Sequence, residues 1–185
     1  QHGNGTEHIF YEDPDVLTIS LHQERNYPLD TGDAKHTGGD NAPFSNMNIP
    51  LMPGGGTAAY KAAFEQLVLP KLAAFKADIV IVACGFDASG VDPLSRMLLG
   101  AADFAMLTDM LMEQTGGKLV MAHEGGYSEA HVPFCGHAVL QTMSGSAITA
   151  EDPLGARIKG QQPEARFNQL QETLISEMAS LHGLK

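Results

Sequence analysis

The sequence has no tryptophan, few basic residues and only two cysteines. It contains 22 aspartate and glutamate residues against 11 lysine and arginine residues, which gives a formal net charge of -11. Because nucleic acids present a negatively charged phosphate backbone, this charge argues against a nucleic-acid partner. The same charge suits a cationic partner, such as a lysine-rich tail or a polyamine.

The cysteines and the apolar segments restrict the cellular setting. Cys84 and Cys135 lie far apart in the sequence, in apolar or glycine-flanked surroundings, so they do not form a zinc-binding motif. So few cysteines are typical of a reducing compartment, and we expect the cytoplasm. No apolar run reaches the roughly 18 residues that a membrane span requires, so we expect no membrane partner.

The most informative stretch of the sequence is residues 79–93, IVIVACGFDASGVDP. Its first six residues are apolar and mostly β-branched, which is typical of a strand buried on both faces of a parallel sheet. Gly85 ends the strand, and Asp87 follows at the carboxyl end, where open α/β sheets bind ligands. Asp87 is therefore a candidate metal ligand or acid–base group. The alternative is an aspartate that only hydrogen-bonds within its own turn.

The second informative stretch is residues 118–127, KLVMAHEGGY. A short apolar strand ends at His123, and two glycines, Gly125 and Gly126, then lead to Tyr127. Glycine allows the backbone to take positive φ or to approach a ligand closely, so this turn can hold the tyrosine hydroxyl over the same sheet edge as Asp87. The alternative is a plain turn with Tyr127 as a core aromatic residue.

The remaining hydrophobic pattern predicts alternating strands and helices in a single domain, residues 1–185. Two further strands are predicted at 16–22 and 44–51, separated by a long polar loop at the active edge. Helices are predicted at 9–14, from Thr57 as N-cap with a kink or split at Pro70, at 100–114, at 137–143, and as an amphipathic segment at 163–185. The segment 145–162 is predicted to be a loop. This order predicts an α/β fold with a parallel sheet and right-handed crossovers.

Three separate motifs are similar to a known family. They are QHGNGTEHIFYEDPDVLTISLH at 1–22, GFDASGVDP at 85–93 and HEGGYSEA at 123–130. In this order they resemble the second half of zinc-dependent deacetylases of the arginase/deacetylase fold, which include class II-type histone deacetylases, bacterial histone-deacetylase-like amidohydrolases and acetylpolyamine amidohydrolases. The segment VPFCG at 132–136 is most similar to the bacterial amidohydrolases. The resemblance extends to Asp152 and implies a three-layer αβα fold, of which the chain is the carboxyl-terminal half.

The resemblance implies chemical roles for several of these residues. Asp87 matches the third protein ligand of the catalytic zinc ion, and Tyr127 matches the tyrosine that stabilises the tetrahedral oxyanion. Tyr27 matches an aromatic wall of the acyl-lysine tunnel, which Gly125 and Gly126 also border. The implied reaction removes an acetyl or longer acyl group from a lysine side chain or a polyamine, and both substrates remain open.

The resemblance also implies bound potassium. Ser20 and Leu21 match ligands of a potassium ion beside the zinc ion. A second, outer potassium ion has backbone-carbonyl ligands, which are matched by Phe10, Asp13, Val16 and Ser45.

Part of the family's site has no counterpart in this sequence. The family supplies two further zinc ligands as Asp-x-His, followed by a second histidine and a Gly-Asn-Gly turn. His2 and residues 3–5 match that histidine and turn, and Gln1 occupies the position of the ligand histidine. The aspartate and the tandem histidines of the general base would lie upstream. We therefore expect half of an enzyme, inactive in isolation and with zinc absent or weakly bound. The alternative is a non-catalytic remnant that acts as a structural or interaction module.

Half of such a sheet would leave apolar strands uncovered. The strands at 16–22 and 79–84 are too apolar to line a solvated surface, so we expect a cut face with open edges. The chain is therefore predicted to form a homo-oligomer or to associate with a missing amino-terminal half.

Overall fold

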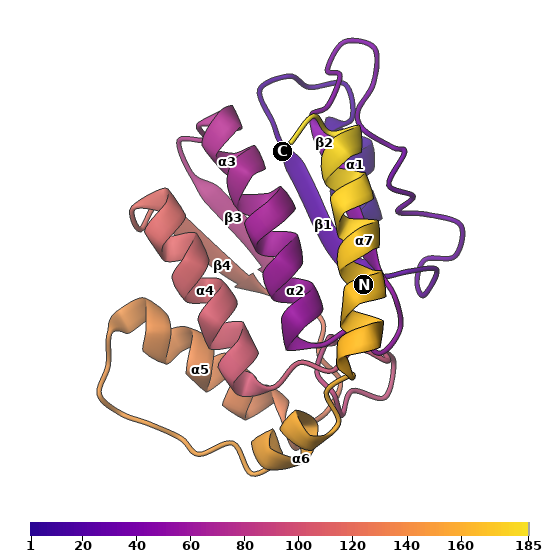
Figure 1. The fold of residues 1–185 in the computed structure, drawn as a ribbon. Helices are drawn as coiled ribbons and strands as arrows, with labels where there is room; N and C mark the ends of the chain where they lie inside the picture. Colours follow the sequence, from indigo (N-terminus) through magenta and orange to yellow (C-terminus); the bar gives the residue numbers. More distant parts are fainter. Residues whose placement is uncertain (185) are drawn as a thin grey trace.

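Four parallel strands form the sheet layer of the protein (Figure 1). The computed structural model describes residues 1–184. Strand β1 (Thr18–Gln23) pairs with β2 (Asn46–Leu51), and β3 (Val80–Cys84) pairs with β4 (Leu119–His123). The two pairs are separate two-stranded sheets, and both are parallel. The predicted α/β class with parallel strands is therefore confirmed.

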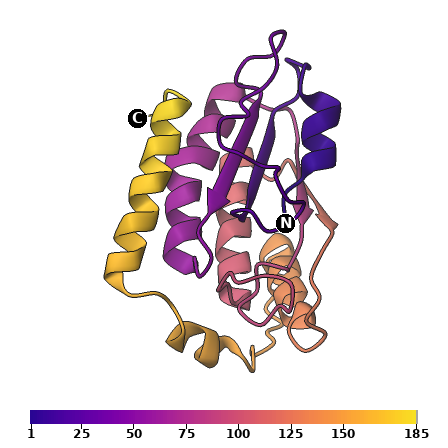
Figure 2. The same ribbon diagram turned by 90° about the vertical axis from the view of Figure 1, so that its right-hand side faces the viewer.

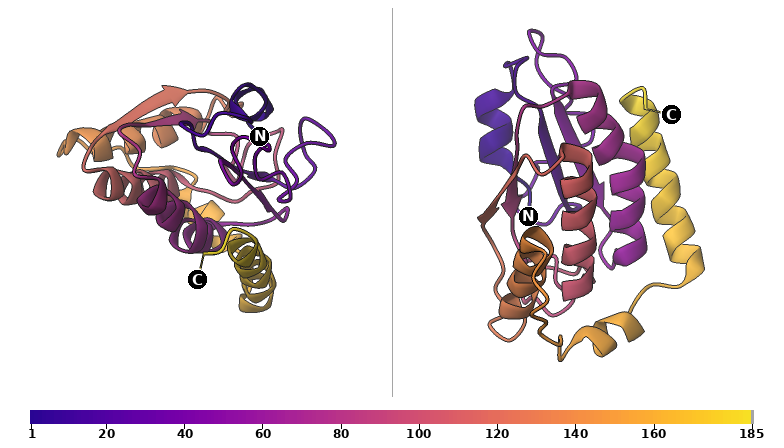
Figure 3. Two further views of the ribbon diagram at one scale, coloured as in Figure 1. Left: turned by 90° about the horizontal axis from the view of Figure 1, so that it is seen from above. Right: turned by 90° about the vertical axis from the view of Figure 1, so that its left-hand side faces the viewer.

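Most of the helices form a layer on one face of these strands (Figures 1 and 3). The layer contains α2 (Thr57–Ala63), the π-helical segment η1 (Phe64–Val68), α3 (Leu69–Phe75), α4 (Ala101–Thr115) and α7 (Ala165–Leu181). Helix α1 (Asn4–Phe10) lies on the opposite side of β1, as Figure 2 shows. Helix α5 (Val132–Ser144) packs against α4, and the short α6 (Gly155–Gly160) precedes α7. Several helices thus cover one face of the strands, whereas the opposite face carries few helices.

The two faces of β2 differ in chemistry. Met47, Ile49 and Leu51 are fully buried and belong to the hydrophobic core. Asn46 and Asn48 are also buried, and they alternate with these apolar residues along the strand. Because successive side chains point to opposite faces of a strand, one face of β2 contacts the helical layer and the other bears a polar network.

The pair β3–β4 is covered on one face only. Ile81 is 68% exposed and Val120 is 45% exposed, whereas Val82 and Met121 pack against the core. The prediction that the strand of residues 79–84 is buried on both faces is therefore wrong for the described chain. Its apolar composition reflects one packed face and one open apolar face.

Pro70 does not split its helix in the predicted way. The helix passes from α2 through the five-residue π-helical segment η1 into α3, and Pro70 lies in the first turn of α3. Proline lacks an N–H and crowds the preceding turn, and a π-helical segment allows the helix to accommodate such a defect without ending.

The helix ends show which contacts local patterns miss. Thr57 is not the N-cap of α2: Gly56 takes that position, and the side chain of Gln162 accepts the hydrogen bond from the Thr57 N–H at 2.8 Å. Helix α1 begins at Asn4 rather than at residue 9, and α5 begins at Val132 rather than at residue 137. Helix α4 ends at Thr115, one residue beyond the predicted end, and Gly116 follows in a left-handed conformation.

The carboxyl-terminal region is more ordered than predicted. The segment 145–162 contains α6, so the prediction of an unbroken loop is wrong there. The amphipathic segment forms α7, which packs against α2 and η1. Its most buried side chains include Gln171, whose Oε1 accepts a hydrogen bond from the backbone N–H of Met52 at 2.8 Å. Within residues 1–184, every helix is too short or too polar to cross a membrane.

Candidate active site

Asp87 and Tyr127 converge at the carboxyl ends of β3 and β4. Asp87 is 6% exposed, and Tyr127 is 47% exposed. A Cβ atom built on Gly125 would lie 3.4 Å from the Tyr127 hydroxyl oxygen and 3.5 Å from Cγ of Asp87. The structure therefore brings together the two side chains that the sequence singles out, and the backbone of Gly125 lies beside both of them.

Gly126 is required by the close approach of the loops that follow β3 and β4. Gly126 has a φ of +128°, a conformation that L side chains rarely adopt. A Cβ on Gly126 would lie 2.9 Å from Cβ of Phe86 and 3.0 Å from a methyl carbon of Val132. The carbonyl oxygen of Gly125 accepts a hydrogen bond from the Phe86 N–H at 2.8 Å. The loop after β4 is therefore pressed against the loop after β3, which sets the height of Tyr127 over the sheet.

The beginning of the chain lies at the same edge. The amino group of Gln1 lies 2.8 Å from Oδ2 of Asp87, and the His2 N–H donates a hydrogen bond to the carbonyl oxygen of Tyr27 at 3.2 Å. Tyr27 itself is 62% exposed. Gln1, the predicted zinc ligand Asp87 and the predicted tunnel residue Tyr27 thus belong to one region.

The described residues do not form a complete zinc site. A catalytic zinc ion takes three protein ligands and keeps one position for water or substrate. Among residues 1–184, no group of three or more histidine, cysteine, aspartate or glutamate side chains is arranged to hold a metal ion. Asp87 contributes one carboxylate, and the side chain of Gln1 offers a neutral amide, which suits hard cations better than zinc.

Tyr60 is a neighbour of the site that the sequence analysis missed. It is buried on α2, and burial together with the charge of Asp87 raises the pKa of its hydroxyl. Its position in an apolar helical stripe predicts only a core residue. Its nearness to Asp87 depends on tertiary packing and has no local sequence signal.

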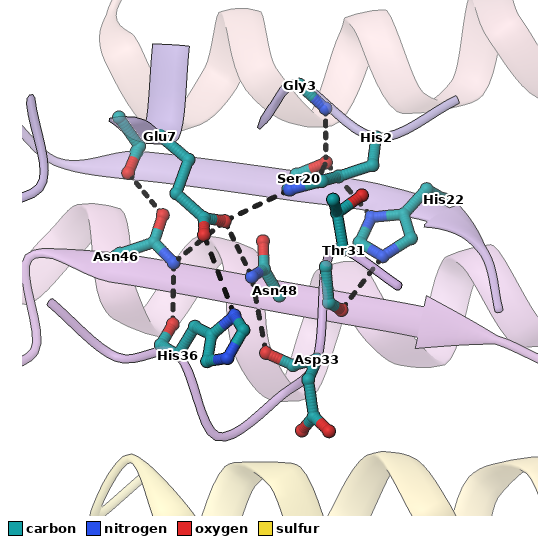
Figure 4. A network of polar contacts seen from close by, with 12 residues as sticks. His2, Gly3, Glu7, Ser20, His22, Thr31, Asp33, His36, Asn46 and Asn48 are labelled. Atoms are coloured by element: carbon teal, nitrogen blue, oxygen red, sulfur yellow. Dashed lines mark hydrogen bonds and ion pairs between the residues drawn. The ribbon is translucent and has the colours of Figure 1, made fainter. Parts of the chain in front are cut away.

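A polar network surrounds Ser20 on β1, next to the site (Figure 4). The Ser20 hydroxyl oxygen lies 3.0 Å from Nδ1 of His2 and 3.0 Å from Nδ1 of His22, and it accepts a hydrogen bond from the Gly3 N–H at 3.3 Å. Nε2 of His22 lies 3.0 Å from the carbonyl oxygen of Gly32. The predicted potassium ligand Ser20 is therefore already a junction between β1, the first residues and the long loop.

Glu7 is the acidic centre of this network (Figure 4). Its carboxylate accepts hydrogen bonds from Asn48 at 2.7 Å and Asn46 at 3.3 Å. Nε2 of His2 lies 3.1 Å from the same carboxylate, and the two form an ion pair when the imidazole is protonated. Burial and the charge of His2 lower the pKa of His22 to about 4, so His22 is neutral at pH 7.

Three of the four residues matched to the outer potassium site lie in the turn at the end of α1. The Asp13 N–H donates to the carbonyl oxygen of Phe10, and the Val16 N–H donates to that of Asp13, at 3.0 and 3.4 Å. The carbonyl oxygen of Ser45 accepts from the Thr18 N–H at 2.9 Å. Phe10, Asp13 and Val16 therefore share one turn, and Ser45 is hydrogen-bonded to Thr18, two residues after Val16.

A serine–histidine–aspartate chain lies behind the site. Nδ1 of His131 lies 2.6 Å from the Ser89 hydroxyl, and Nε2 lies 2.9 Å from Oδ2 of Asp152. Burial opposes the charge of Asp152, but hydrogen bonds from His131, Leu154 and Ala101 outweigh it, and the pKa of Asp152 lies below its usual value. Ser89 and His131 are fully buried, so a substrate cannot reach them. The three hydrogen-bonded residues therefore have a structural role, and Ser89 is not a nucleophile.

Comparison with known proteins agrees with these motifs. The family model of the histone deacetylase domain matches residues 1–143. A histone deacetylase-like amidohydrolase from Pseudomonas aeruginosa is 46% identical over 99% of this chain and 49% of the relative. The histone deacetylase clr3 from Schizosaccharomyces pombe is 40% identical over 78% of this chain and 22% of the relative.

Solved structures agree in fold. A structure of the histone deacetylase Clr3 matches 98% of this chain and 30% of its own, with a TM-score of 0.82 and 32% identity. A crystal structure of the HDA15 HD domain matches 99% of this chain and 52% of its own, with a TM-score of 0.80 and 30% identity. The chain thus spans about half, or less, of the length of these relatives. From the family model and the Pseudomonas relative together, the chain belongs to the histone deacetylase family.

Proposed function

We propose that the protein is a deacetylase or amidohydrolase and that this chain supplies Tyr127 and Asp87 to its active site. The observation that carries the proposal is the convergence of the Tyr127 hydroxyl and the Asp87 carboxylate on Gly125. Family membership supports the reaction class. The two cysteines support a cytoplasmic setting for this reaction.

Tyr127 acts on the oxygen of the scissile amide. Its hydroxyl donates a hydrogen bond to the carbonyl oxygen, which gains negative charge as the carbon becomes tetrahedral. The ring is half-exposed, so a substrate can reach the hydroxyl from solvent. The hydrogen bond strengthens as charge develops, and it therefore lowers the barrier rather than the ground state.

Asp87 supplies a metal-binding carboxylate. Zinc is part of the proposal because the family resemblance assigns this aspartate to it, and a zinc ion would act as a Lewis acid there. The residues described here provide one such ligand where three are needed, so no reaction step is assigned to zinc on this chain. The potassium sites at Ser20 and Leu21 and at the outer turn belong to the same proposal.

The proposed substrate is an acylated lysine or an acylated polyamine. The net charge of -11 supports a cationic partner of this kind. The test is an assay of the complete gene product with an acetyl-lysine peptide and with an acetylpolyamine, alongside Tyr127→Phe and Asp87→Asn. Turnover of either substrate that falls sharply in both variants is the expected result. Turnover that is unchanged in both variants would overturn the assignment.

A non-catalytic interaction module is the second candidate. The open apolar face of β3–β4 favours it, because such faces are usually covered by a partner. Under this proposal the partner is a second copy of the chain or the half of the fold that its relatives possess. Absence of turnover by the complete gene product, together with stable association, is the outcome that would favour this candidate.

A further inference from the structure

Asp92 is a buried carboxylate on the loop between β3 and α4. It is 6% exposed, and among residues 1–184 no basic side chain forms an ion pair with it. Its two oxygens are bound instead by backbone groups of two different loops. Oδ1 accepts from the Leu94 N–H at 2.9 Å, and Oδ2 accepts from the Tyr127 N–H at 2.7 Å. Asp92 therefore ties the Tyr127 backbone to the loop that contains Asp87.

The Tyr127 backbone needs such an anchor. Tyr127 directly follows two glycines, whose backbones are the least restricted of any residue. Its side chain is half-exposed, so packing alone holds it weakly. Two hydrogen bonds join this segment to the loop after β3: the Phe86 N–H to the Gly125 carbonyl, and the Tyr127 N–H to Asp92. Only the second acts on the tyrosine itself.

A carboxylate suits this task better than its neutral isostere. Both of its oxygens are acceptors, so it binds two N–H groups at once, whereas an asparagine presents an NH₂ group to one of them. Burial of a carboxylate without a basic partner carries a desolvation cost, so simple packing does not explain the residue. The hydrogen bonds of Asp92, one of them from the Tyr127 N–H, instead indicate that it fixes the position of the tyrosine.

We infer that Asp92 is a positioning residue for Tyr127, which holds the tyrosine hydroxyl beside Asp87 through the Tyr127 backbone N–H. The expected effect of Asp92 on turnover rests on the proposed function. The expected effect of Asp92 on the Tyr127 backbone does not. The two effects are therefore measured separately.

The kinetic test compares Asp92→Asn in two backgrounds of the complete gene product. In the wild-type background, kcat should fall by about 10- to 100-fold with KM nearly unchanged, because a small misplacement of a reacting group has that size of effect. In the Tyr127→Phe background, the same substitution should have almost no further effect. Asp103→Asn is the matched control, since Asp103 also accepts a backbone N–H, that of Gly100, but does not contact Tyr127. Equal losses of kcat in both backgrounds would overturn the inference.

The second test measures hydrogen exchange of backbone amides by NMR and needs no activity. The Tyr127 amide should be protected in the wild-type protein, and Asp92→Asn should speed its exchange by about 10-fold or more while the Gly100 amide is unchanged. A wild-type Tyr127 amide that exchanges like an unprotected peptide would overturn the inference, even if Asp92→Asn fails to fold. If the wild-type protein turns over no acylated substrate, the proposed function fails, and the exchange rates still decide the role of Asp92.

Discussion

His131 and Ser89 form a fully buried contact of 2.6 Å that joins α5 to the loop after β3. The other ring nitrogen of His131 faces Asp152, whose carboxylate also accepts hydrogen bonds from Ala101 and Leu154. One imidazole therefore links the amino-terminal ends of α4 and α5 to the segment before α6. The arrangement stabilises both loops of the candidate site without taking part in chemistry.

Replacing His131 should destabilise the protein strongly. His131→Ala leaves the buried Ser89 hydroxyl and the largely buried Asp152 carboxylate without their main partner, so we expect a loss of about 2–4 kcal/mol in the free energy of unfolding. Urea denaturation at pH 7 measures this loss. His8→Ala, on the exposed side of α1, is the control and should change little. A loss for His131→Ala no larger than that for His8→Ala would contradict the structural role.

Removing the Tyr127 hydroxyl should affect turnover alone. If the complete gene product is active, Tyr127→Phe should lower kcat by about 10²-fold or more, because the lost hydrogen bond acts on charge that develops in the transition state. Zinc content and KM should stay close to the wild-type values. Steady-state kinetics with elemental analysis tests this, and a variant with near-normal kcat would remove Tyr127 from the mechanism.

The isolated 185-residue chain should not retain zinc. Asp87 is one ligand, and a single carboxylate falls far short of the roughly 10–16 kcal/mol by which complete structural zinc sites hold the metal. Elemental analysis after dialysis should therefore find much less than one zinc per chain, and the chain should not deacetylate acetyl-lysine or an acetylpolyamine. Roughly one zinc per chain that is lost in Asp87→Ala would show that other groups complete the site.

The open face of β3–β4 should make the isolated chain associate. Ile81 and Val120 present apolar surface to water, and burying such surface is favourable. Sedimentation velocity should show dimers or larger species, and Ile81→Thr should weaken them while keeping a β-branched residue in the strand. The matched control is Ile148→Thr, because Ile148 is exposed in the segment after α5, outside this face. A monodisperse monomer at high concentration would contradict this prediction.

Stability should fall on mild acidification because of buried histidine. The pKa of His22 is lowered to about 4, from an unfolded value of about 6.5. Between these values the unfolded chain binds a proton that the folded chain does not, so the free energy of unfolding decreases as the pH falls from about 6.5 toward 4. Burial also lowers the pKa of His182 to about 4, so His182 adds to the slope.

The contribution of His22 can be isolated by substitution. His22→Asn should reduce the slope of unfolding free energy against pH between about pH 6.5 and 4, by an amount that corresponds to at most one bound proton. Urea denaturation across this pH range supplies both slopes. Equal slopes in the wild-type protein and His22→Asn would show that His22 is not held neutral by the fold.

Local patterns in the sequence predict the strands and the position of the candidate site. Apolar runs ended by glycine place Asp87 and Tyr127 after β3 and β4, and parallel pairing then brings their carboxyl ends together. The same patterns predict α4 and α7 within two residues at their amino-terminal ends. These features depend on residues close together in the sequence.

Features that depend on distant residues could not be predicted in this way. Gln162 caps α2 from about a hundred positions away, and Asp92 reaches Tyr127 across an entire helix. The open face of β3–β4 was missed because an apolar run predicts burial without saying which elements cover each face. Each of these features depends on how the elements pack, which periodicity alone does not specify.

The Ser20 hydroxyl determines the tautomers of both neighbouring histidines. The carbonyl oxygen of Gly32 can only accept, so Nε2 of the neutral His22 carries the hydrogen and its Nδ1 accepts the hydroxyl hydrogen of Ser20. The Ser20 oxygen can then accept from Nδ1 of His2, which leaves Nε2 of His2 facing Glu7. A proton at that nitrogen places a positive charge opposite the Glu7 carboxylate, and the Ser20 side chain keeps its present hydrogen bonds throughout.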